Sequence, residues 1–123
     1  MGGTAGRLVG PVAWSVPLLI VVQAAMIGQT WYGSTSLIAL HGSTGNLTFV
    51  LAVVTLALAW QARRSGPALL LAFATVVLLF AQTGLGYLGH RTGLTVASSV
   101  HVTLGVLVTG VAAAAAMRCS AER

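Results

Sequence analysis

Charged residues are scarce in this sequence. Only 6% of its 123 residues are charged, and aspartate and glutamate together supply a single side chain, whereas 57% of the residues are hydrophobic. Soluble globular domains carry roughly a quarter charged residues, so this composition excludes an ordinary soluble domain and predicts a membrane protein. The one acid, Glu122, lies near the C-terminal end. Proton-coupled transporters usually need a carboxylate inside the membrane, which argues against that class.

Cysteine is scarce and lysine is missing. Cys119 is the only cysteine, which excludes an intrachain disulfide and the paired-cysteine chemistry of membrane thiol oxidoreductases. No nucleophile and base arrangement, glycine-rich phosphate loop or soluble-domain metal motif is present, so hydrolases and nucleotide-binding enzymes are set aside. All six basic residues are arginine, a bias typical of a GC-rich bacterial genome. Together with the apolar composition, this bias leads us to expect a protein of the bacterial cytoplasmic (inner) membrane.

The sequence does contain four long apolar runs. A bilayer core about 30 Å thick needs roughly 20 apolar residues per helix, and four segments meet this length: 8–30, 37–60, 67–88 and 94–117. The connections are short, with turns expected at 32–36, 61–66 and 89–93. The sequence therefore predicts one all-α domain over 1–123, a transmembrane up-down-up-down four-helix bundle.

The arginines are distributed unevenly between the two sides of the predicted spans. Five of the six fall before the first span, between the second and third, or after the fourth; they are Arg7, Arg63, Arg64, Arg118 and Arg123. By the positive-inside rule, both termini are then cytoplasmic. The net charge of +5 reflects this topology and contact with anionic lipid headgroups, and it does not indicate a nucleic acid partner.

An internal repeat is the most informative pattern. His41 follows Gln23 by 18 residues, and His101 follows Gln82 by 19. Each histidine is in turn followed by a glycine at the fourth position. The repeated residues are polar ones inside apolar spans, where a chance match would more often involve leucine. The chain therefore consists of two copies of a two-helix hairpin.

The two histidines are expected at the same depth in the membrane. They lie one to two turns inside helices that run in the same direction, which at about 1.5 Å per residue places both imidazoles roughly 6–10 Å below the outer boundary. Two neutral imidazoles facing each other across a bundle can ligate a metal, and haem iron with two axial histidines suits a bilayer without charged side chains. The sequence thus predicts His41 and His101 as the metal ligands of a haem b.

Small and polar residues near the histidines fit this prediction. Gly45 and Gly105 stand beneath the histidines on the same helix faces, where a flat porphyrin would need the side chain removed. Gln23 and Gln82 are expected at a similar depth, and Arg91 at the outer rim could pair with the haem propionates. Neighbouring hydroxyls could bond the other ring nitrogen of each ligand; they belong to Ser43, Thr44, Ser98, Ser99 and Thr103.

A purely structural interpretation of the same residues stays open. An intramembrane histidine is often a helix-to-helix hydrogen-bonding residue, worth about 0.6 kcal/mol. The two glycines could be close-packing positions, and the two glutamines could serve packing alone. The chain would then be a non-catalytic accessory subunit of a membrane (respiratory) complex, without a cofactor of its own.

The stretch from Gln82 to Gly105, with QTGLGYLGHRTGL and VHVTLG, resembles the third and fourth helices in one half of haem A synthase. That family has eight helices in two similar four-helix units, each with a histidine on its second and fourth helices. The resemblance implies that His41 and His101 are axial ligands of a haem near the outer face. Gly42 follows His41 where the family has arginine, and the outer side holds no acid or cysteine pair. The implied property is therefore haem binding rather than the family's oxidation of a haem methyl group.

These patterns together predict a small b-type cytochrome that passes single electrons. A quinone or a larger respiratory complex is the expected partner within the lipid bilayer. Any enzymatic activity would be that of a haem-dependent membrane oxidoreductase. Whether two copies assemble into an eight-helix homodimer is left open by the sequence.

Overall fold

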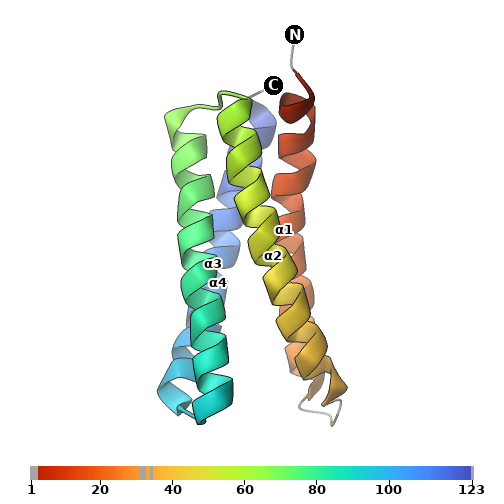
Figure 1. The fold of residues 1–123 in the computed structure, drawn as a ribbon, viewed down its shortest axis with the longest axis vertical. Coiled ribbons are helices and arrows are strands. Elements are labelled where there is room, and N and C mark those ends of the chain that lie inside the picture. The colour runs from red at the N-terminus through yellow and green to blue at the C-terminus, as the bar shows by residue number, and fades with distance from the viewer. Residues whose placement is uncertain (1–2, 31–32, 34, 123) are drawn as a thin grey trace.

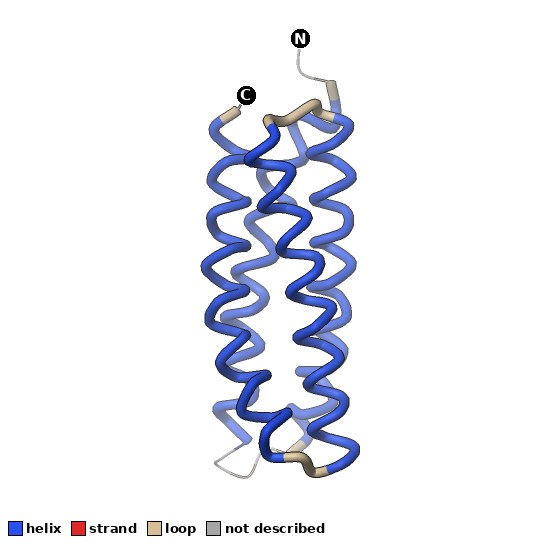
Figure 2. The backbone as a smooth tube through the Cα atoms, turned by 90° about the vertical axis from the view of Figure 1, so that its left-hand side faces the viewer, coloured by secondary structure: helices blue, strands red, loops and turns tan. Residues whose placement is uncertain are grey.

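A computed structural model describes residues 3–30, 33 and 35–122 of the chain. Within these ranges all regular structure is helical, in four elements: α1 (Thr4–Thr30), α2 (Ser36–Gln61), α3 (Gly66–Thr92) and α4 (Thr95–Ala121). Figure 1 shows them side by side as a bundle, and Figure 2 shows that they are long and run roughly along one axis. The predicted all-α four-helix bundle is confirmed.

The helices alternate in direction, so the bundle has two distinct ends. The start of α1, the α2–α3 connection and the end of α4 lie at one end, while the end of α1, the start of α2 and the α3–α4 connection lie at the other (Figure 1). We call the first the arginine end, because it carries Arg7, Arg63, Arg64 and Arg118, and the second the histidine end. Arg123 falls outside the described residues.

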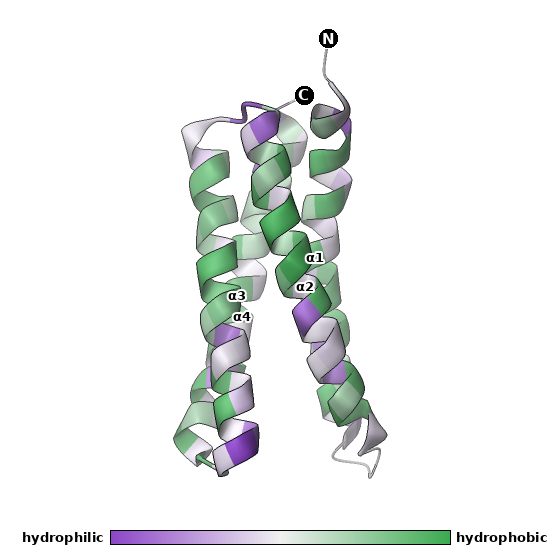
Figure 3. Cartoon of the chain, viewed as in Figure 1, coloured by the Kyte–Doolittle hydropathy of each residue, from purple (hydrophilic) through white to green (hydrophobic). Residues whose placement is uncertain are grey.

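All four helices are long and apolar enough to cross a membrane. Large apolar side chains remain exposed on the outside of the bundle, including Leu18 at 62%, Phe80 at 72% and Val96 at 76%. Figure 3 shows apolar residues along most of the helix surfaces, with hydrophilic residues at both ends of the bundle and at a few places in its histidine-end half. Such a surface is stable in lipid and would aggregate in water. The chain is therefore a multi-pass membrane protein.

Small residues make up most of the interior. One buried cluster joins all four helices near the arginine end, and its members are Val9, Ala13, Ala59, Ala68, Ala116 and Cys119. A second cluster lies nearer the middle, formed by Val16, Ala52, Leu79, Val108 and Ala112. In lipid, helices associate through close van der Waals packing, which small side chains permit. Beyond the second cluster, the hairpins α1–α2 and α3–α4 diverge toward the histidine end (Figure 1).

The helix ends extend past the apolar runs. The expected turn at 89–93 is wrong, because α3 continues to Thr92 and ends at Gly93, whose φ of 69° is left-handed. This conformation is easy only for glycine, which sets the end of the helix there. At its other end α3 has Pro67 in the first turn, and the Ser65 side chain accepts a hydrogen bond from the Ala68 N–H. Both features are typical helix starts.

Candidate functional site

The two hairpins bring His41 and His101 together. His41 lies in the first two turns of α2 and His101 in the first two turns of α4, so both enter the bundle from the histidine end. Their ring centres are 6.2 Å apart and their planes cross at 78°. Both side chains are only partly exposed. The repeat in the sequence therefore corresponds to one shared site at the interface between the two hairpins.

The same backbone contact orients each imidazole. Nδ1 of His41 lies 3.2 Å from the carbonyl oxygen of Gln23, and Nδ1 of His101 lies 2.8 Å from the carbonyl oxygen of Gln82. A carbonyl can only accept a hydrogen bond, so Nδ1 carries the proton and donates it. In a neutral imidazole this leaves an unprotonated lone pair on Nε2, the atom that a metal would take.

The hydroxyls near the histidines have a different role from the expected one. Four of them donate to the carbonyl four residues earlier in their own helix; they are Ser43, Thr44, Ser98 and Thr103. Such bonds are common for Ser and Thr inside helices. The partner of each ring nitrogen is instead a main-chain carbonyl of the preceding helix. A carbonyl leaves no signal in the amino-acid sequence, so this partner could not have been predicted.

The two glycines after the histidines face the glutamine side chains. A Cβ on Gly45 would lie 3.1 Å from Oε1 of Gln23, and a Cβ on Gly105 would lie 3.1 Å from Nε2 of Gln82. These contacts are tighter than ordinary van der Waals packing, so each glycine makes room for the amide of the paired helix. In this structure the space is used by glutamine, which favours the close-packing interpretation of both glycines.

The glutamine side chains differ in their hydrogen bonding. Nε2 of Gln23 donates to Oγ1 of Thr48 at 2.8 Å. Thr48 follows His41 by seven residues, and the position seven residues after His101 is Val108, which has no hydroxyl. Within the described chain, Oε1 of Gln82 is buried without a hydrogen-bond partner. The repeat therefore holds for the contact of each Nδ1 with a glutamine carbonyl, but it is broken about two turns deeper.

This difference predicts opposite responses to one substitution. Gln82→Leu should leave the thermal stability of the detergent-solubilised chain unchanged or raise it, because it removes a buried acceptor that lacks a partner. Gln23→Leu should lower stability by about 0.6 to 1 kcal/mol, the usual value of a hydrogen bond between membrane helices. Thermal unfolding followed by circular dichroism measures both. The variants control for each other, since each loses one amide beside a glycine. Equal losses of stability in the two variants would contradict the conclusion that Gln23 makes a stabilising side-chain hydrogen bond and Gln82 does not.

Gly86 of α3 is a site residue that sequence reasoning missed. A Cβ at this position would lie 2.9 Å from Cε1 and 3.2 Å from Nδ1 of the His101 ring. Real Cβ atoms essentially never come so close to another heavy atom, so the ring can occupy its place only because residue 86 is glycine. The available signal was its spacing, since Gly86 follows Gln82 by four residues, just as Gly45 and Gly105 follow the histidines.

The remaining predicted residue is Arg91. It is exposed in the last turn of α3, at the histidine end of the bundle. A contact between the hairpins on this side comes from Asn46, whose Nδ2 donates to the hydroxyl of Tyr87 at 3.1 Å. Deeper along the same pair of helices, the Phe49 and Phe80 rings are 6.3 Å apart. These contacts link α2 to α3 beside the histidine layer.

Comparison of the chain with protein-family models, curated proteins and solved structures finds no match. In the described part of the chain, no group of three or more His, Cys, Asp or Glu side chains could hold a metal ion. The site is thus limited to two imidazoles, set by two backbone carbonyls and one close glycine. Any function has to be argued from that geometry.

Proposed function

We propose that the chain is a membrane haem protein in which His41 and His101 bind one haem iron from opposite sides. The observation that carries the proposal is the 6.2 Å between the two ring centres. A histidine nitrogen binds a metal at about 2.0–2.1 Å, which places the centres of two rings on opposite sides of one ion about 6.3 Å apart. The distance between the ring centres is therefore consistent with two ligands of one iron.

The donor set favours haem over a bare metal ion. Structural zinc sites use four protein ligands and catalytic zinc sites use three, whereas only two imidazoles converge here. Haem brings four equatorial nitrogens of its own and needs only axial ligands from the protein. A pair of neutral imidazoles in an apolar bundle meets that need.

The surrounding residues would position the ligands. The carbonyls of Gln23 and Gln82 hold Nδ1–H of each imidazole and keep Nε2 free for iron, and such partners fix ring orientation and raise ligand basicity. Arg91 at the histidine end would pair with the propionate carboxylates. When bound, the haem supplies one-electron oxidation and reduction.

The same proposal includes orientation and partners. The arginines at one end of the bundle support cytoplasmic termini by the positive-inside rule, which puts the haem near the outer face of a bacterial inner membrane. A haem b at this depth could exchange single electrons with a quinone or with a larger respiratory complex. The described chain has almost no loops to recognise a water-soluble partner.

A second candidate is an accessory subunit without a cofactor. The ring distance and the 78° crossing are also typical of two aromatic rings packed edge to face, which prefer centres about 4.5–7 Å apart. The histidines would then serve only to join the two hairpins. A quinone or haem would have no place in the mechanism, and the complex that recruits the chain would supply the chemistry.

An absorption spectrum separates these candidates. The full chain is expressed in cells supplied with haem, purified in detergent and measured oxidised and reduced. The expected result is a Soret band and the sharp visible bands of six-coordinate haem, at about one haem per chain. A folded, helical chain that carries no haem, and takes up none when haem is added, would support the accessory-subunit candidate instead.

A further inference from the structure

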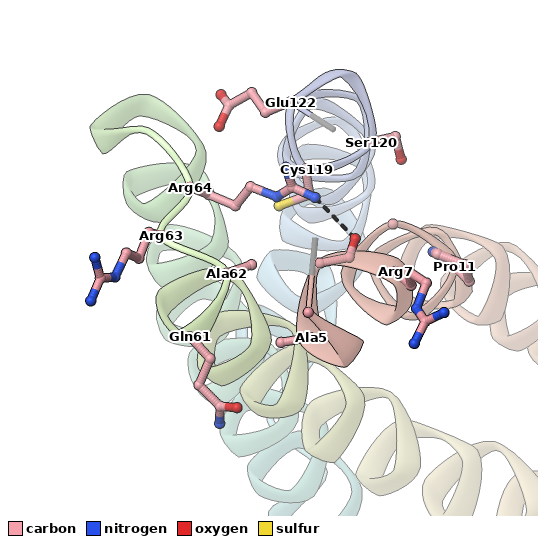
Figure 4. A pocket seen from close by; sticks show the side chains of 13 residues that line it. Ala5, Arg7, Pro11, Gln61, Ala62, Arg63, Arg64, Cys119, Ser120 and Glu122 are labelled. Carbon is pink, nitrogen blue, oxygen red and sulfur yellow. Dashed lines mark hydrogen bonds between the residues drawn. The ribbon is translucent and has the colours of Figure 1, made fainter. Parts of the chain in front are cut away.

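A pocket of about 1040 Å³ opens at the arginine end of the bundle. It lies where the start of α1, the α2–α3 connection and the end of α4 meet (Figure 4). Its lining contains Arg7, Arg63 and Arg64 against a single carboxylate, that of Glu122. In Figure 4 the Arg64 side chain crosses the middle of this region, whereas the exposed side chains of Arg7 and Arg63 point outward on opposite sides of it. The pocket therefore carries excess positive charge.

Arg64 is held in place but keeps hydrogen-bonding capacity. One terminal nitrogen of its guanidinium donates to the carbonyl oxygen of Gly6 at 3.1 Å, which ties the α2–α3 connection to α1. Its Nε is buried and has no acceptor among the residues that the structure describes. A charged donor without an acceptor is costly in a partly buried place. An anion in the pocket would offset part of this cost through its charge, without contacting the buried Nε.

Arg63 occupies a backbone position that normally belongs to glycine. Its φ is 52°, the only positive φ found at a non-glycine residue in the described chain. The N–H of Arg63 bonds the Trp60 carbonyl and the N–H of Arg64 bonds the Ala59 carbonyl, which is the pattern that ends many helices with a left-handed glycine. An arginine at this position costs backbone strain. Its exposed side chain extends outward from the α2–α3 connection at the rim of the pocket (Figure 4).

The carboxylate of Glu122 is hydrogen-bonded to Ser65 rather than to the arginines that line the pocket. Its two carboxylate oxygens accept hydrogen bonds from the hydroxyl and the backbone N–H of Ser65. These bonds lower the pKa of the Glu122 carboxyl, and the nearby Arg64 and Arg118 charges act in the same direction. Glu122 therefore stays ionised near neutral pH and fastens the end of α4 to the start of α3.

We propose that this pocket binds the phosphate group of an anionic phospholipid headgroup. The pocket lies at the ends of helices that are long and apolar enough to span a membrane, which is where lipid headgroups would be expected. Guanidinium groups bind phosphate oxygens through charge-assisted hydrogen bonds, and basic pockets between membrane helices bind acidic headgroups. The site is at the opposite end of the bundle from the histidines, so it does not depend on haem binding.

The test measures lipid binding to the full chain by native mass spectrometry in detergent. Dioleoyl phosphatidylglycerol should bind and survive removal of the detergent, whereas dioleoyl phosphatidylcholine should not. Arg63→Gly should weaken phosphatidylglycerol binding about fivefold or more, the effect of one arginine near an acidic headgroup. This variant removes the charge but suits the left-handed backbone, so the turn is kept. Arg7→Gln, which alters an exposed side chain, should have a similar effect.

Arg118→Gln is the matched control. It removes one positive charge from an exposed site at the same end that is not part of the pocket lining, so binding should fall by less than about twofold because this side chain would not contact the headgroup. An equal loss in Arg118→Gln and Arg63→Gly would show diffuse attraction and overturn the proposal. So would equal retention of the two lipids. If inorganic phosphate in molar excess displaces the lipid, the occupant is a soluble phosphate and the assignment to lipid is wrong.

Discussion

His101→Ala and His41→Ala are each expected to abolish the six-coordinate haem spectrum. Changing even a residue that only orients a metal ligand usually costs 10- to 100-fold in affinity, so loss of a ligand itself should cost more than about 100-fold. The two imidazoles are 6.2 Å apart on opposite hairpins, and neither can replace the other. Haem titration of each purified variant, followed by absorbance, measures the effect.

His90→Ala provides the matched control for this experiment. His90 is the third histidine of the chain, and it is exposed in the last turn of α3. Its loss should leave both the spectrum and the haem affinity unchanged. If His90→Ala removed the spectrum while His41→Ala kept it, the axial ligands would have been assigned to the wrong side chains. A full spectrum in all three variants would mean that haem binds elsewhere.

The fold could be predicted from sequence because the bilayer restricts the choices. A chain with four apolar runs and short connections can satisfy its backbone in lipid only as helices, and short connections make neighbours antiparallel. The ends of the individual helices were predicted less well. The apolar run of the third span stops at Leu88, but α3 continues four residues further to Thr92, since a helix ends where its backbone is capped and not where its side chains become polar.

The candidate site could be predicted only in part. The meeting of His41 and His101 followed from the repeat, because equal positions in two similar hairpins fall at equal depth. The backbone carbonyls that bind the imidazoles could not be identified from the sequence, since every residue has a backbone carbonyl. The role of Gly45 was attributed to a porphyrin, whereas the structure places the Gln23 amide against it. Contacts of this kind depend on how closely two helices approach, which spacing along one helix does not reveal.

Gly86→Ala is expected to weaken haem binding about tenfold or more. The added Cβ would lie 2.9 Å from Cε1 of His101, and the ring cannot yield easily, because its Nδ1 is bonded to the Gln82 carbonyl at 2.8 Å. Forcing one extra carbon into a packed site usually costs about 1–3 kcal/mol, and here that cost falls on the orientation of a ligand. Haem titration measures the affinity, and NMR of the His101 ring protons in the haem-free chain reports whether the imidazole has moved.

Gly84→Ala separates this contact from the general effect of removing a helix glycine. Gly84 is two residues earlier in α3, and a Cβ there would meet no atom within 4 Å. Both variants gain about 1 kcal/mol of helix propensity, so a difference between them must come from the contact with the ring. Haem affinity should stay at the parent value in Gly84→Ala and fall in Gly86→Ala. If both variants bind haem like the parent chain, the place of the His101 ring beside Gly86 does not control ligation, and the ring must bind iron from another position.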